Sequence, residues 1–170
     1  ESASNRKLAF AFCTDEAGSR TEKMRITGDG QVTKPKSCAF NYNGNGNQSL
    51  NSGDTLTSWR STDSRGFENT NTGGYLSSGV FTAPVAGAYF FTSTILLSGL
   101  SSNTNSVHVY WQKNGSGYYQ YWNTRFPGDT NWGYGGYVPA IGATTMYMSA
   151  GDTCRIKISY SGSGIGQYAP

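Results

Sequence analysis

The stretch from Gly79 to Leu97, GVFTAPVAGAYFFTSTILL, constrains the fold of this chain more than any other segment. Pro84 is incompatible with a helix interior and forces the residue before it into an extended conformation, and Gly87 supplies a turn. The residues that follow alternate between two faces, which predicts one long strand. One face holds Tyr89, Phe91, Ile95 and Leu97, and the other holds Ala88, Phe90, Thr92 and Thr94. Large side chains on both faces predict a central strand of a sandwich, covered by the opposite sheet on one side and by a neighbouring subunit on the other.

The remainder of the chain favours an all-β fold. A length of 170 residues suits one domain of ordinary size with an appendage. The chain has 23 glycines and 12 tyrosines, and only 14% of its residues are charged. Many short strands separated by polar turns, with almost no helix-forming runs, are typical of an all-β protein. No window has the length and apolarity of a membrane span, so membrane insertion is not expected.

Charge and cysteine usage exclude further classes of function. The net charge of +3 is mild and the basic residues are scattered, so nucleic-acid binding is not expected. The three cysteines, Cys13, Cys38 and Cys154, have no spacing that resembles a metal site. We interpret them as buried or partly buried thiols of a protein made in a reducing cytosol, with a disulfide between Cys38 and Cys154 as the alternative.

The charge density changes near Lys36. Residues 1–36 hold 7 of the 13 basic and 5 of the 10 acidic residues, although they make up about a fifth of the 170-residue chain. The remaining residues, 37–170, hold fewer charges over a far longer segment. This difference predicts two structural units, 1–36 and 37–170, with Pro35 marking the linker.

The first unit is predicted to contain three short strands, at residues 7–12, 22–26 and 31–33. Their apolar side chains fall on one face of each strand, and these are Leu8, Phe10 and Phe12 in the first strand and Met24 and Ile26 in the second. Three short strands cannot bury such faces alone, so they need a partner, which three-fold association would supply. The alternative is a plain β-meander that packs on the main domain.

The second unit is predicted to be built from strands with turns of the type that joins hairpins. Expected strands lie at residues 38–42, 55–59, 80–82, 88–97, 106–112, 118–123, 143–149 and 154–160. Asn114-Gly115 and Gly151-Asp152 are hairpin turn sequences, whereas residues 43–47 and 69–74 are predicted to be loops. In the last strand Cys154, Ile156, Ile158 and Tyr160 share one face.

Two segments carry resemblances to known families. GVFTAPVAGAYFF, at 79–91, resembles the signature of the complement one-q/tumour-necrosis-factor-like jelly roll, and MSAGDTCRIKI, at 148–158, is similar to the penultimate hairpin of that family. The pattern LAFAF…TEKMRITGDGQV, within residues 7–33, resembles a segment of phage tail-fibre proteins that precedes a C-terminal head. The family has a final, often aromatic strand in the middle of its sheet; here the chain stops at Pro170, so we expect either that this strand is missing or that the resemblance fails at this end.

Together these resemblances imply a ten-stranded-type jelly-roll head at 37–170 after a β-rich stem at 1–36, in a homotrimer. The implied function is that of the distal head of a phage tail fibre, which binds a host cell-surface glycan or outer-membrane protein. The implied partners are two further copies of the chain and other virion tail proteins, the expected location is the virion after assembly in the host cytoplasm, and no cofactor is expected. A structural module that trimerises and caps a fibre is the alternative, and a glycan-cleaving depolymerase is the third hypothesis.

Candidate contact residues come from an aromatic-rich stretch and from the apolar faces. Aromatic rings mixed with Asn, Ser and Gly are typical of recognition loops. Candidate ligand contacts are Trp132, Tyr134, Tyr118, Trp122 and Asp129. The alternative is that these rings pack at the trimer axis, because interfaces also enrich Tyr and Trp. Predicted trimer contacts are Leu8, Phe10, Phe12, Met24, Ile26 and Phe90.

No catalytic or metal-binding residues are predicted. His108 is the only histidine and lies within a predicted strand, where a serine-triad role would need a supporting acid that the sequence does not place. The carboxylates outside the stem segment are few and lie in turns or loops: Asp54, Asp63, Glu68, Asp129 and Asp152. Paired carboxylates can cleave a glycosidic bond, but no pair is indicated here, and no acidic cluster favours calcium.

Overall fold

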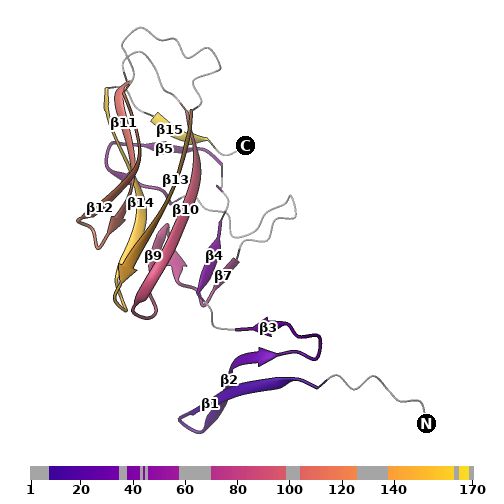
Figure 1. Ribbon diagram of the computed structural model, residues 1–170. Coiled ribbons are helices and arrows are strands. Elements are labelled where there is room, and N and C mark those ends of the chain that lie inside the picture. Colours follow the sequence, from indigo (N-terminus) through magenta and orange to yellow (C-terminus); the bar gives the residue numbers. More distant parts are fainter. Residues whose placement is uncertain are drawn as a thin grey trace.

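The protein is an all-β jelly-roll sandwich that follows a small separate sheet, as Figure 1 shows. The computed structural model describes residues 8–34, 38–42, 44, 46–57, 70–98, 104–125, 138–162 and 165–168. Within these residues every regular element is a strand, which confirms the predicted fold class. No helix in this part of the chain has the length and apolarity needed to span a bilayer.

Two antiparallel sheets form the head. The four-stranded β10 sheet has the order β13 (Val138–Met148), β10 (Gly87–Ser98), β15 (Ile165–Tyr168) and β5 (Gln48–Leu50). The six-stranded β11 sheet has the order β12 (Gly117–Arg125), β11 (Thr104–Lys113), β14 (Thr153–Gly162), β9 (Val80–Thr82) and β8 (Leu76–Ser77), and β6 (Asp54–Thr55) also pairs with β14. A separate pair joins β4 (Ala39–Asn41) and β7 (Thr70–Thr72). Within the described residues these two sheets have four and six strands, which matches the predicted ten-stranded type.

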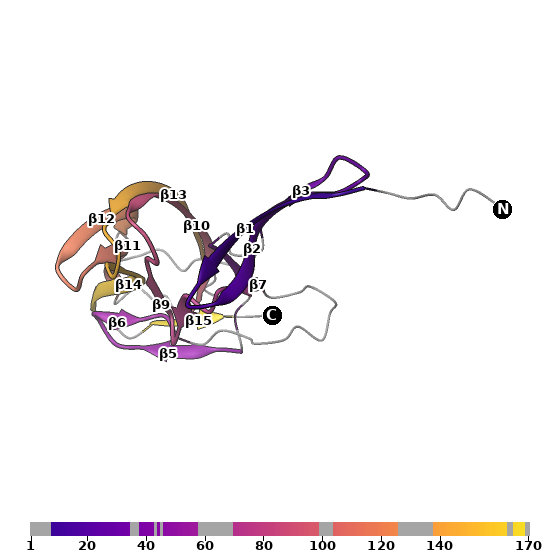
Figure 2. The ribbon, with the colours of Figure 1, turned by 90° about the horizontal axis from the view of Figure 1, so that it is seen from below.

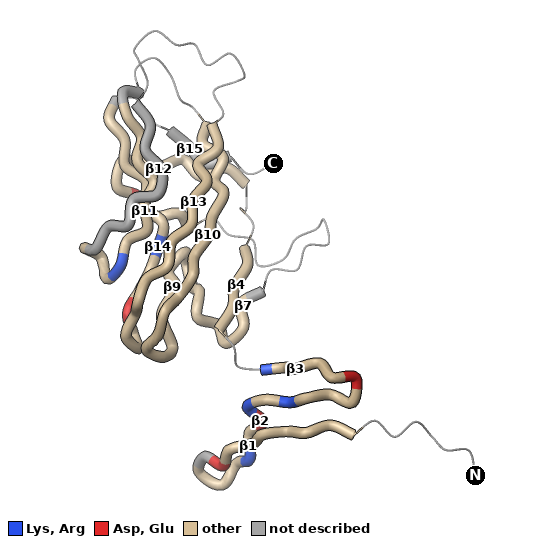
Figure 3. The backbone as a smooth tube through the Cα atoms, viewed as in Figure 1, with Lys and Arg blue, Asp and Glu red and all other residues tan. Residues whose placement is uncertain are grey.

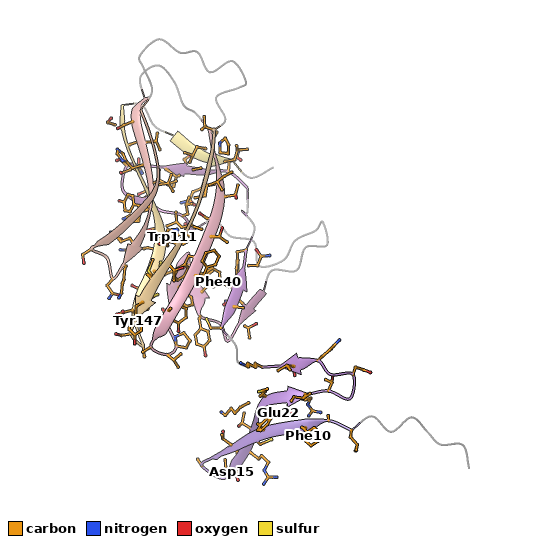
Figure 4. The ribbon with its side chains drawn as sticks, in the orientation of Figure 1. Phe10, Asp15, Glu22, Phe40, Trp111 and Tyr147 are labelled. Atoms are coloured by element: carbon orange, nitrogen blue, oxygen red, sulfur yellow. The ribbon has the colours of Figure 1, made fainter. Side chains whose placement is uncertain are left out.

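The core lies between the two sheets and comes from alternate residues of their long strands. The β10 sheet contributes Phe91, Ile95, Leu97, Ala140, Met146 and Met148, and the β11 sheet contributes Phe81, Val107, Val109, Trp111, Cys154, Ile156 and Ile158. This confirms the predicted inward faces of β10 and β14. Aromatic rings meet at the centre, where Phe91 lies 5.5 Å from Phe81 and 5.2 Å from Trp111 between ring centroids. Figure 4 labels Phe40, which belongs to β4, and Trp111, which belongs to β11.

The stem is the three-stranded sheet of β1 (Phe10–Glu16), β2 (Ser19–Ile26) and β3 (Val32–Thr33). Figures 1 and 2 show it projecting from the head as a sheet of its own. Its first turn uses Ala17 and Gly18 at φ of 49° and 79°, and a second turn closes at Gly30, whose N–H donates to the Thr27 carbonyl. The predicted boundary between stem and head, at residue 36, lies outside the described residues.

The structure corrects the expectation that the final strand is missing. β15 inserts between β10 and β5, and pairs Leu96 with Tyr168 and Leu50 with Ile165. It is a short strand of 4 residues, with Gly166 inside it. A Gly-containing segment of this length carries no usable periodicity, so its strand conformation depends on the two neighbours that it bridges.

Other differences concern short polar segments and the cysteines. β7 occupies part of the segment predicted as a loop at 69–74, and the strand predicted at 55–59 is reduced to β6, since Leu56 and Thr57 follow it and the rest lies outside the described residues. All three cysteines are free thiols, which excludes the alternative disulfide in this structure. Cys154 is buried and Cys38 is partly buried, as predicted, but Cys13 is exposed on the stem, and the prediction for it was wrong.

Candidate functional site

The outer surface of the β10–β13 ladder is an exposed and largely apolar face. Antiparallel pairing places Ala88 opposite Tyr147, Phe90 opposite Thr145, Thr92 opposite Ala143 and Thr94 opposite Ile141, so these side chains share one side of the sheet. All of them are exposed in the protomer. We call these residues the head face.

Three large side chains dominate the head face. Phe90, Ile141 and Tyr147 are 69%, 62% and 66% exposed, respectively. An exposed apolar patch of this kind on a sheet is typical of an interaction site, because contact with a partner removes apolar surface from water, which is favourable. The prediction that Phe90 lies on the face of β10 opposite the core is confirmed, although no partner covers that face within one protomer.

The head face carries no charge. Neither β10 nor β13 contains a Lys, Arg, Asp or Glu residue, and Figure 3 shows both strands without blue or red. The stem, by contrast, carries both blue and red segments. An uncharged surface of long, paired strands avoids the cost of burying unpaired charges, so it suits close packing against another apolar surface.

The stem has a second exposed apolar face. Phe10 pairs with Ile26, Phe12 pairs with Met24, and Ile26 also pairs with Val32, so the side chains project from one side of the stem sheet. We call these residues the stem face. Phe10 and Phe12 are 71% and 58% exposed, which leaves the face uncovered within one protomer. Leu8 precedes β1 and is exposed as well.

The stem face supports the sequence interpretation at the level of the hairpin. Phe10 and Phe12 were predicted to point to one side, as were Met24 and Ile26, and the register now places all four on the same side. A bulge between Phe12 and Cys13 ends this regular alternation. Phe10, Phe12 and Val32 remain exposed in the protomer, whereas Met24 and Ile26 are half-buried.

The candidate ligand contacts are positioned only in part. Trp132, Tyr134 and Asp129 lie outside the described residues, in the segment between β12 and β13. Tyr118 and Trp122 lie on β12, where Tyr118 pairs with Gln112 and Trp122 pairs with Val109 of β11. The backbone therefore places Tyr118 near the β11–β12 turn and Trp122 towards the other end of the strand.

His108 has no carboxylate beside it in either ladder. It is half-buried on β11, and its cross-strand partners are Asn123 of β12 and Ser159 of β14. This agrees with its interpretation as a histidine of a sheet. In the part of the chain that the structure describes, no group of three or more His, Cys, Asp or Glu side chains is placed to hold a metal ion.

Asp152 joins two hairpin turns at one end of the head. Its carboxylate accepts hydrogen bonds from Lys113 Nζ at 2.9 Å, from Asn114 Nδ2 at 2.7 Å and from the Ser149 N–H at 2.8 Å. The Lys113 ammonium and then the Asn114 amide lower the pKa of Asp152 from 3.8 to about 2. Asp152 is thus a turn residue, as predicted. Asp54 has a similar role, since it accepts a hydrogen bond from the Asn51 N–H at 2.7 Å.

The Asp152 network predicts a defined dependence of stability on pH. Because the folded pKa is lower than 3.8, the stabilisation is complete above about pH 4 and is lost as the pH falls through about 2. We expect Asp152→Asn to unfold at lower urea concentration than the parent at pH 7, and the difference to disappear near pH 2. Urea titrations from pH 2 to pH 7 would measure it. Asp15→Asn, at an exposed position of the stem strand β1, is the control and should leave the urea midpoint unchanged.

Comparisons with known proteins give no family. No family model matches the chain, and no curated protein sequence matches it. The structure is similar to Eiger TNF from S. frugiperda, at 14% identity over 78% of this chain and 92% of that chain, with a TM-score of 0.48. It is also similar to a carbohydrate-binding module from Cellvibrio mixtus lichenase 5A in complex with cellotriose, at 13% identity over 96% of this chain and 86% of that chain, with a TM-score of 0.31. At these TM-scores neither similarity supports a conclusion about function.

Proposed function

We propose that this chain forms the homotrimeric distal head of a phage tail fibre or related virion appendage, and that it binds a receptor on the host cell surface. The observation that carries the proposal is the uncharged, exposed head face, in which Phe90, Ile141 and Tyr147 are each more than half exposed in the protomer. A protomer with this surface needs an apolar partner, and another copy of the chain supplies one of matching character.

Association about a three-fold axis accounts for both apolar faces at once. In such a ring each chain contacts the next one head to tail, and the third chain contacts the first. The apolar patch of every copy can then be buried, and no copy is left with an uncovered patch. The stem, which carries its own apolar face, would then unite the same three chains at the base of the head. A trimer would also hold three copies of each candidate recognition segment, so that weak single contacts combine into strong attachment.

The receptor in this proposal is a glycan or an outer-membrane protein. The aromatic residues between Tyr118 and Tyr134 provide large, rigid contact surfaces next to adaptable polar groups, as recognition loops do. The remaining partners are other proteins of the virion. The competing hypothesis is a structural module that trimerises and caps the fibre, because apolar trimer contacts support that role equally well.

Two measurements test the proposal in sequence. Light scattering of the purified chain should give three times the mass of 18.3 kDa, and a monomer at micromolar concentration would contradict it. Binding of the labelled trimer to a panel of bacterial strains should then be strain-selective. A trimer that binds no strain would favour the capping module, and release of reducing sugar ends from the cells would favour a glycan-cleaving enzyme.

We expect Trp132→Ala to weaken cell binding without changing the oligomeric mass. Trp side chains are the most frequent interface hot spots, so the apparent dissociation constant should rise roughly tenfold or more. Flow cytometry over a series of protein concentrations would measure this. Val85→Ala, which truncates an exposed side chain on the turn before β10, serves as the control and should bind as the parent does.

A further inference from the structure

The outer face of the β11 sheet is the second broad surface of the sandwich, and it lies on the sheet that does not carry the head face. Val109 and Ile158 are core residues, so the residues beside them on β11 and β14 point away from the core. Three cross-strand pairs of β11 and β14 make up the centre of this surface: His108 with Ser159, Tyr110 with Lys157, and Gln112 with Arg155. We call these six residues the cationic face.

The cationic face holds positive charge that no carboxylate of its own sheet balances. The strands β8, β9, β11, β12 and β14 contain no Asp or Glu residue. The remaining strand, β6, contributes Asp54, whose carboxylate bonds to the backbone of the preceding turn. Lys113, at the end of β11, is bound to Asp152. Among the described residues Arg155 and Lys157 form no ion pair, so their charges favour an anionic ligand.

Arg155 is held in place by a buried side chain. Its Nε donates a hydrogen bond of 2.8 Å to Oε1 of Gln112, which is 4% exposed. This bond orients the planar guanidinium and does not use its Nη atoms. A guanidinium that is oriented before a ligand arrives loses less conformational entropy when it binds a carboxylate. Arg155 is therefore the anchor of the cationic face.

Neutral polar groups surround the two charges at the dimensions of a sugar ring. Neighbouring strands lie about 4.8 Å apart, and residues two apart on one strand lie about 7 Å apart. The pair of Tyr110 with Lys157 and the pair of Gln112 with Arg155 therefore enclose an area close to that of one pyranose ring. The third pair continues the same surface along the strands. Phenol, hydroxyl and cationic groups in this arrangement suit a ligand that carries both hydroxyls and negative charge.

An acidic sugar matches the cationic face better than a protein or a nucleic acid does. A protein partner needs a core of apolar contacts, and none of the six residues is aliphatic. A nucleic acid spreads its phosphates along a backbone and binds to many cations, whereas this face has two. An acidic sugar carries its carboxylate and its hydroxyls on one ring, next to each other. In a phosphate-linked polymer the charge lies between the rings, which fits this compact arrangement less well.

We propose that the cationic face binds a polysaccharide with carboxylates on its rings. Arg155 takes a carboxylate through the fork of its guanidinium, and Lys157 adds a second positive charge about 7 Å away. Tyr110 offers its ring and its hydroxyl to the sugar between them. Because the polymer repeats, the cationic faces of several heads can bind along one chain, which strengthens attachment.

An acidic polysaccharide as the receptor deepens the proposed function and rests on it. In the proposed trimer the head face of the β10 sheet is buried, and the cationic face lies on the other sheet of the sandwich. Assembly and receptor contact then use opposite sheets, so both can occur at once.

Calorimetric titration of the full chain tests the proposal with defined oligosaccharides. The probe is an octamer of galacturonic acid, in which every ring carries a carboxylate, and its methyl ester is the uncharged control. We expect the octamer to bind and the ester to bind at least roughly tenfold more weakly. A phosphorylated mannan and duplex DNA should both bind more weakly than the octamer. No binding of the octamer, equal binding of the ester, or tighter binding of either phosphate polymer would overturn the proposal.

Two double variants with the same change of charge locate the site. Arg155→Gln with Lys157→Gln should weaken octamer binding roughly tenfold or more, because charged hydrogen bonds are lost. Arg20→Gln with Lys34→Gln removes two exposed charges of the stem and should bind as the parent does. If the loss of Arg155 prevents folding, Lys157→Glu alone should weaken binding to a similar extent. Equal binding by all variants would place the octamer on another surface and overturn the proposal.

Cell binding separates this site from the proposed function. A trimer that binds bacterial cells equally well with and without the substitutions at Arg155 and Lys157 would keep the proposed function and overturn the carboxylate site. A monomer that binds no cells, but binds the octamer through Arg155 and Lys157, would overturn the proposed function and keep the carboxylate site.

Discussion

Ile141→Asp is expected to convert the proposed homotrimer into folded monomers. Ile141 is 62% exposed in the protomer and lies on the head face opposite Thr94, so its burial depends on a partner. Losing one buried aliphatic side chain removes about 2 kcal/mol, and three copies change the trimer association constant by roughly four orders of magnitude. A carboxylate without a counter-ion in the same interface adds to the loss.

Light scattering and circular dichroism together measure the effect of Ile141→Asp. The mass should fall to that of one chain, while the β-sheet spectrum is kept. Val85→Asp is a matched control, because Val85 is 63% exposed but lies on the turn before β10, outside the head face. If Ile141→Asp still has the parent mass at low micromolar concentration, the head face is not the subunit interface.

The sequence predicted the long strands because each of them has one face in the core and one face that is more exposed. Along β10, Phe91, Ile95 and Leu97 are buried, while Phe90 next to them is 69% exposed. Along β14, Cys154, Ile156 and Ile158 are buried in the same alternation. Period-2 alternation is a local property that survives in the sequence, so these faces were predictable without knowing which strand pairs with which.

The short strands were not predictable in the same way. β5 and β7 have the sequences QSL and TNT, which carry no apolar alternation. The first half of β13 was also missed, because Pro139 and Gly142 usually interrupt a strand. In the described residues β13 is an edge strand of the β10 sheet. An edge strand tolerates a proline, because one side of its backbone has no strand to pair with. Pairing with residues distant in sequence determines whether these segments form strands.

The candidate interface was predictable only in outline. Phe90 was identified from its own strand, but Ile141 and Tyr147 join it through the register between β10 and β13, which the sequence does not reveal. In the stem, the faces of β1 and β2 were predicted separately, and the pairing of Phe10 with Ile26 unites them. A surface built from two strands is a property of their alignment, which turn geometry and packing set together.

Phe91 and Phe90 are adjacent in sequence, and their truncation is expected to have opposite consequences. Phe91 is 3% exposed, and its ring lies 5.2 to 6.4 Å from those of Trp111, Phe81, Phe40 and Tyr89. Removing it leaves a cavity at the centre of the core, so Phe91→Ala should destabilise the protomer by about 3–5 kcal/mol. For a chain of this size the midpoint of thermal unfolding would fall by roughly 6–20 °C.

Phe90→Ala is the matched control, and the monomeric Ile141→Asp background separates folding from assembly. In that background Phe90→Ala should change the free energy of unfolding by less than about 0.5 kcal/mol, because the ring is exposed in the protomer. In the parent, the same substitution should instead raise the concentration at which the proposed trimer dissociates. Urea unfolding of the monomers and light scattering of a dilution series measure the two effects. Equal destabilisation of the monomer by both substitutions would mean that the ring of Phe90 is buried within a single chain, and the head face would then lose its role as a subunit contact.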